Sequence, residues 1–117
     1  MTEADIQQIA QLTLDLEGLQ RYFHVDVAPD RKPLRVLRNE AVSQEPRLVK
    51  FGEPVTYVSA PDAQKEKKPY FEFTKLEARG DTAQVEFSYP VEGIRGWASF
   101  RRVDGAWTLE GKSLTER

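Results

Sequence analysis

The last third of the chain, residues 70–116, alternates between apolar and polar positions with the period of two that is typical of β-strands. Three short turn signals interrupt this alternation, and each sets a glycine beside an acidic residue: Gly80-Asp81, Glu92-Gly93 and Asp104-Gly105. Alternating runs joined by such turns predict antiparallel neighbours. The pattern therefore predicts a four-stranded antiparallel meander.

The turns also predict the register of the strands, and hence which side chains share a face. With two-residue turns at the last two sites, Phe100 faces Leu109, Ala98 faces Gly111, and Phe87 faces Ala98. Both turns collect the same apolar residues on one face: Val85, Phe87, Tyr89, Ala98, Phe100, Trp107 and Leu109. Small residues among these aromatics leave room for a helix, so this face is expected to carry the core.

The opposite face of the predicted sheet combines aromatic and basic side chains. A two-residue turn at Gly80-Asp81 places Phe71 and Phe73 on this face with Trp97. A β-bulge or another register shift in the first strand would return both phenylalanines to the core, and residues 23–58 could also cover them. If they are exposed, they belong to a binding surface, because exposed apolar patches mark contact sites. The residues predicted for this surface are Phe71, Phe73, Arg95, Trp97, Arg101 and Lys112.

Residues 2–23 carry the helical pattern of the chain. Its apolar residues recur at spacings of three and four: Ile9, Leu12, Leu16, Leu19 and Phe23. Thr2 with Asp5 resembles a helix start in which the hydroxyl caps the first turn, and Gly18 predicts a break. We therefore expect a single α+β domain over residues 1–117, with one principal N-terminal helix packed on a bent antiparallel sheet.

The middle of the chain predicts shorter elements. Alternation at residues 23–27, 34–37 and 55–58 predicts three short strands. The stretch 38–54 is irregular, and the polar segment 59–68 predicts an exposed, mobile loop. None of these segments repeats another, and no change of composition divides the chain into domains.

Composition narrows the class of protein. The 117 residues are 39% hydrophobic and 31% charged, which suits one small domain with a thin core. A net charge of −2 provides no field that attracts nucleic acid or anionic lipid. No apolar run is long enough to span a membrane, and no charged-then-apolar leader follows Met1. The expected compartment is the cytoplasm by default, and export with a trimmed signal stays open.

Few residues offer catalytic chemistry. The absence of cysteine excludes disulfides, thiolate metal sites and a cysteine nucleophile. His24, the only histidine, shares a strand face with Asp26, and an imidazole beside a carboxylate is a candidate general base. A structural histidine is the favoured interpretation, because no nucleophile or second acid is placed near it. Metal-ligand spacings and phosphate-binding glycine loops are missing, so we expect no metal and no cofactor.

A helix followed by a long meander resembles the cystatin-like architecture, which includes the nuclear transport factor 2-like folds. The resemblance rests on the helical face from Ile9 to Phe23. It also rests on the ending Gly105-Ala106-Trp107-Thr108-Leu109, which looks like the last hairpin of many small bacterial members. It implies a curved sheet. Enzymes of this group generally use an Asp-His pair in a conical pocket, which His24 and Asp26 would match.

Two functions are open at this point, because this architecture hosts enzymes, binding proteins and immunity proteins alike. The favoured one is a non-catalytic module that binds a protein partner, or a second copy of itself. It would use the outer sheet face or the edge near residues 57–73, as in a bacterial accessory or immunity protein. The alternative is a small-molecule binder or pocket enzyme with His24 and Asp26 at its mouth. Nucleic acid is not expected, because the net charge is negative.

Overall fold

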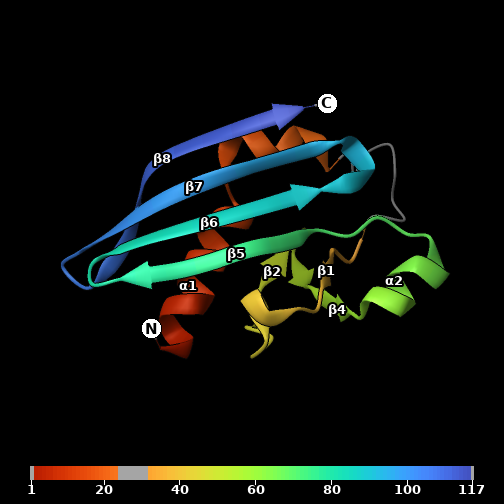
Figure 1. Ribbon diagram of the computed structural model, residues 1–117, viewed down its shortest axis with the longest axis horizontal. Helices are drawn as coiled ribbons and strands as arrows, with labels where there is room; N and C mark the ends of the chain where they lie inside the picture. The colour runs from red at the N-terminus through yellow and green to blue at the C-terminus, as the bar shows by residue number, and fades with distance from the viewer. Residues whose placement is uncertain (1, 24–31, 117) are drawn as a thin grey trace.

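The computed structural model describes residues 2–23 and 32–116 (Figure 1). The helical segments are α1 (Glu3–Leu14), the 3₁₀ turn η1 (Glu17–Tyr22), η3 (Glu40–Val42), α2 (Ala60–Glu66) and η4 (Pro90–Glu92). The strands are β1 (Arg35–Leu37), β2 (Val49–Lys50), β3 (Glu53–Pro54), β4 (Thr56–Val58), β5 (Glu72–Arg79), β6 (Thr82–Tyr89), β7 (Ile94–Val103) and β8 (Ala106–Glu116). The expected α+β fold, with one main N-terminal helix and a C-terminal antiparallel meander, is confirmed.

The N-terminal helix α1 begins with the predicted cap. The Thr2 hydroxyl accepts a hydrogen bond from the Asp5 backbone N–H at 3.1 Å, and the Asp5 carboxylate accepts one from the Thr2 N–H at 3.1 Å. The α-helix ends at Leu14, and the chain continues as η1 on the far side of a short break. The predicted break near Gly18 therefore falls a few residues earlier, at Asp15 and Leu16.

The meander has the strand order β5-β6-β7-β8, and all its neighbours are antiparallel. The first and last turns contain two residues, as predicted. The middle connection is two residues longer than predicted, because η4 occupies it and Tyr89 pairs with Ile94. Phe87 therefore faces Gly96 rather than Ala98. A shift of two residues preserves the face of every side chain, so the predicted core face of β6 and β7 is confirmed.

A β-bulge in β5, one of the alternatives that the sequence left open, buries Phe71 and Phe73, so both are wrong as members of the predicted binding surface. Phe73 pairs with Phe87 and Lys75 pairs with Glu86, which leaves Thr74 as an extra residue between them. The extra residue turns the preceding part of β5 over. Both phenylalanines are fully buried, and Phe71 stacks on Phe87 with ring centroids 5.6 Å apart. Neither belongs to a binding surface.

A second bulge lies in β8. Phe100 faces Leu109 as predicted, but the next pair is Ser99 with Gly111, so Glu110 has no partner on β7. Every later residue of β8 therefore lies on the face opposite to the predicted one.

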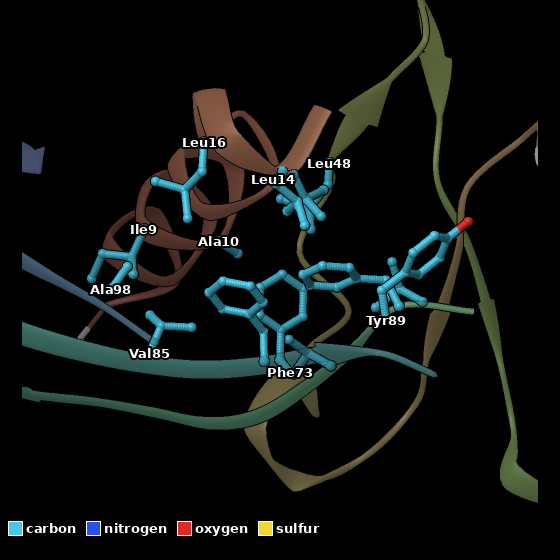
Figure 2. Packing of buried hydrophobic residues seen from close by; sticks show 14 of the residues in the cluster. Ile9, Ala10, Leu14, Leu16, Leu48, Phe73, Val85, Tyr89 and Ala98 are labelled. Carbon is cyan, nitrogen blue, oxygen red and sulfur yellow. The ribbon is translucent and has the colours of Figure 1, made fainter. Parts of the chain in front are cut away.

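The core lies between the helical segments and the inner face of the sheet (Figure 2). The side chains of Ile9, Ala10 and Leu14 in α1, and of Leu16 just after it, point toward strand residues: Phe73, Val85, Tyr89 and Ala98. The six largest fully buried side chains are aromatic: Phe23, Phe71, Phe73, Phe87, Tyr89 and Phe100. Leu109, which was predicted on the core face, is 44% exposed on the edge strand.

Two short strand pairs extend this arrangement. β1 pairs with β4 in parallel, and β2 pairs with β3 antiparallel. Backbone hydrogen bonds join β1 to the start of β5, from Leu37 N–H to the Phe71 carbonyl at 2.8 Å and from Phe71 N–H to the Arg35 carbonyl at 2.7 Å. The strands predicted at 34–37 and 55–58 are therefore present, whereas the strand predicted at 23–27 lies mostly outside the described residues.

The loop predicted over 59–68 is wrong, because this segment contains α2. Ser59 caps the helix by accepting a hydrogen bond from the Asp62 N–H at 3.2 Å, and Pro61 lies in its first turn. Within residues 2–23 and 32–116, no helix is both long and apolar enough to cross a membrane.

Candidate functional site

The outer face of the meander, opposite α1, contains an open groove of about 630 Å³. Two cross-strand rows form its centre. In one row Arg95 of β7 lies between Ser88 of β6 and Thr115 of β8, and in the other Trp97 lies between Glu86 and Ser113. The groove therefore combines one indole, one guanidinium, one carboxylate and several hydroxyl groups.

Phe87 and Ile94 also line this groove but are buried, whereas the Trp97 side chain is 40% exposed. Its ring lies beside Gly111, where an added Cβ would be 3.7 Å from the Cη2 and Cζ3 atoms of the indole. The other tryptophan has a structural role: Trp107 is 4% exposed and donates from Nε1 to the Asp5 carboxylate at 3.0 Å. Trp97 donates to no acceptor in the described part of the chain, so its indole N–H is available to a ligand.

Arg95 is exposed and has neither an ion-pair nor a hydrogen-bond partner within residues 2–23 and 32–116. Lys75, on the same face, differs because it approaches the carboxylates of Glu77 at 3.7 Å and Glu86 at 3.6 Å. An arginine offers five N–H donors in a planar fork that fits carboxylates. Arg95 is therefore a free cation beside an exposed indole.

Gly96 fixes the backbone beneath these two side chains. A Cβ at this position would lie 2.3 Å from the carbonyl oxygen of Ser113, closer than real Cβ contacts occur. Only glycine fits where β7 and β8 approach so closely. The alternation Arg95-Gly96-Trp97 thus places both functional side chains on the outer face and none between them on the inner face.

Arg101 and Lys112 do not join the groove as predicted. Arg101 lies on the outer face, but beyond Ser99, and its Nε is 3.0 Å from the Glu110 carboxylate. Lys112 lies on the opposite face because of the bulge at Glu110, where it pairs with Ala98. The predicted pairing of Ala98 with Gly111 is wrong for the same reason. Of the six residues predicted for the surface, Arg95 and Trp97 remain.

The bulge brings in two residues that the sequence did not indicate, Ser113 and Thr115. A regular strand would have placed them on the inner face, whereas the structure places them beside Trp97 and Arg95. Their signal in the sequence is polarity: two hydroxyl residues are poor candidates for a core-facing row.

The other candidate regions offer less. Tyr57, at the edge predicted as an alternative surface, is half-buried; its hydroxyl donates to the Pro46 carbonyl, and burial raises its pKa. His24 and Asp26 lie outside the described residues. Within the part that is described, no group of three His, Cys, Asp or Glu side chains is placed to hold a metal ion.

The comparisons with known proteins give no relative. The chain matches no protein-family model, no curated protein and no solved structure. The resemblance to the cystatin-like architecture therefore stays a prediction, and function rests on the site alone.

Proposed function

We propose that this protein is a non-catalytic interaction module whose outer sheet face binds a partner protein. The observation that supports it is the exposed indole of Trp97 beside the unpaired guanidinium of Arg95 in one groove. Tryptophan and arginine are among the residues that contribute most to binding energy at protein interfaces. A bacterial accessory or immunity protein would be one example of such a module.

The alternative, a small-molecule binder or pocket enzyme, has no supporting observation among residues 2–23 and 32–116. It requires space between the helix and the sheet, and the rings of Phe23, Phe71 and Tyr89 pack against one another there. The proposal for the outer face needs no interior space.

The test is to capture partners from a lysate of the source organism with wild-type protein and two variants, Trp97→Ala and Arg95→Glu. Both variants should keep the wild-type circular dichroism spectrum, because both side chains are exposed. Each should weaken binding of the captured protein by about 30-fold or more, the loss expected at a central interface residue.

The matched control is Val49→Ala, which shortens a side chain that is 51% exposed and does not line the groove. It should retain the wild-type partner. Equal capture by the wild type, Val49→Ala and both groove variants would contradict the proposal. If Trp97→Ala fails to fold, Arg95→Glu still tests the proposal, because this variant reverses the charge in the groove and keeps the Trp97 ring.

A further inference from the structure

The outer edge of β8 is open. The strand order leaves β8 paired with β7 alone, and its backbone makes no hydrogen bond to any described residue outside that ladder. In Figure 1 β8 forms one rim of the sheet, and no described helix or strand continues the sheet beyond it. At the other edge, β1 pairs with Phe71, the residue just before β5, and the Asn39 side chain donates to the Phe73 carbonyl. A row of free N–H and C=O groups is a template for another strand.

Only the second half of β8 can accept a regular partner. The bulge at Glu110 interrupts the strand, and bulges protect edges against pairing. Beyond it, residues 112–116 pair without interruption with residues 98–94 of β7. This five-residue segment is therefore the available template.

The template is complementary to itself. It reads Lys112-Ser113-Leu114-Thr115-Glu116. In an antiparallel pair with a two-fold axis at the central leucine, Lys112 faces Glu116 of the second copy, and Ser113 faces Thr115 of the second copy. The two leucines then face each other. Opposite charges, hydroxyl pairs and apolar pairs are the favourable combinations across antiparallel strands.

The faces and charges of the segment agree with this pairing. Lys112, Leu114 and Glu116 lie on the side of the sheet that carries the helices, and Leu114 is packed against the core there. Neither Lys112 nor Glu116 forms an ion pair with a described residue, so both charges are available. Gly18 of η1 presents no side chain at this point, and a Cβ there would lie 3.1 Å from Leu114 Cδ1.

We propose that β8 pairs antiparallel with β8 of a second copy, with Leu114 on the two-fold axis. The homodimer then has one continuous sheet. The contact involves only five residues of each strand, so we expect a weak dimer whose population increases with protein concentration. Because neighbouring strands are about 4.8 Å apart, the two β7 strands lie roughly 14 Å apart. The two Trp97 grooves therefore open on the same face. The pairing does not depend on the proposed function of that face.

Charge exchange tests the register. Lys112→Glu sets two carboxylates opposite each other at both ends of the pairing, and Glu116→Lys sets two ammonium groups there. Each should raise the dimer dissociation constant about tenfold or more in sedimentation equilibrium. The double variant Lys112→Glu/Glu116→Lys restores both ion pairs and should return the constant to within about threefold of wild type. Lys68→Glu, an equal charge change at an exposed residue outside β8, should have little effect.

A cysteine scan provides a second measurement, because the chain contains no cysteine. Directly opposed residues have Cα atoms about 4.5–5.5 Å apart, within reach of a disulfide. Leu114→Cys should therefore give a covalent dimer under mild oxidation, whereas Thr108→Cys, before the bulge, should not. A protein that is monomeric at every concentration would overturn the proposal and leave this edge for a strand of another protein. Two other results would also overturn it. One is a dimer dissociation constant that the charge-exchange variants leave unchanged, and the other is equal disulfide formation by Leu114→Cys and Thr108→Cys.

Discussion

Asp5 is the residue at which the first helix and the last hairpin meet. Its carboxylate caps α1 and also accepts hydrogen bonds from Trp107 Nε1 at 3.0 Å and from Arg102 at 3.4 Å. Arg102 lies over the Trp107 ring at 5.0 Å, as its cross-strand position indicates. The hydrogen bond from Trp107, supported by the Thr2 backbone N–H and the Arg102 charge, lowers the pKa of Asp5 below its ordinary 3.8.

This lowered pKa predicts a pH dependence of stability. A carboxyl group with a lower pKa in the folded state stabilises the protein above its unfolded pKa, and this contribution is lost as the pH falls through the folded pKa. Asp5→Asn should therefore lower the free energy of unfolding most at neutral pH, and the difference from wild type should shrink below about pH 4. Urea titrations at several pH values measure it. Asp104→Asn is the control for net charge; an equal loss in both variants would contradict this role.

Lys50 is a second residue that joins distant segments. Its side chain is only 9% exposed, and its ammonium group lies 3.3 Å from the Asp15 carboxylate and donates to the Gln20 side chain. It also lies over the Phe23 and Phe51 rings, at 5.3 and 5.8 Å. The ammonium group of Lys50 therefore links β2 to the segment that contains Asp15 and Gln20.

Lys50→Met keeps the aliphatic stem and removes the charge. It should lower the free energy of unfolding by about 1–3 kcal/mol, because hydrogen bonds from a charged donor and its contacts over two aromatic rings are lost. Lys75→Met, at a side chain that is 39% exposed in its ion pairs, should change it by less than about 1 kcal/mol. Chemical denaturation compares the two. Similar losses would mean that the burial of Lys50 is unimportant.

Among the elements, β5 shows how one extra residue determines which face of the sheet the preceding side chains occupy. Thr74 is the residue that the ladder between β5 and β6 omits. Deletion of Thr74 should yield a regular strand in which Phe73 still pairs with Phe87 and still points inward. The variant should fold with a melting temperature within about 5 °C of wild type.

Deletion of Glu77 from the same strand is the matched comparison. It moves Lys75 to an inward position opposite Val85 and should abolish cooperative unfolding, because a lysine enters the core without a partner. Calorimetry distinguishes the two deletions. Unfolding of the Thr74 deletion, with survival of the Glu77 deletion, would contradict the role of the bulge.

The two bulges also explain which predictions from the sequence succeed. Alternation identified the core face of β6 and β7. The connection at η4 is two residues longer than predicted, but moving the register by two residues leaves each side chain on the same face of the sheet. A bulge moves the register by one residue, so the side chains beyond it change face. Neither Thr74 nor Glu110 is a glycine or part of a turn signal, so alternation alone left Phe71 and Phe73 open between the core and the outer face and placed Lys112 on the wrong face. The helix α2 was missed, because the polarity of residues 59–68 outweighed the helix start that Ser59 and Pro61 form.

For the whole molecule, the fold class and the core face followed from the periodicity of the chain. The two surviving site residues, Arg95 and Trp97, lie between the bulges on a regular stretch of β7 whose face no bulge alters. The open edge of β8 was not visible in the sequence, because strand order depends on where β1 docks. β1 reaches β5 through two backbone hydrogen bonds that no local pattern specifies.

The contact between Asp5 and Trp107 joins residues 102 positions apart, and the apolar face of α1 packs on strands from the last third of the chain. On the ribosome, α1 emerges about 100 residues before the last strand of its docking surface. At about 5–20 residues per second, this interval lasts roughly 5–20 s. Throughout it, the apolar side chains of α1 have no sheet to cover. The helix α1 can therefore dock only after the strands of the meander have been synthesised, and until then its apolar face is exposed to aggregation.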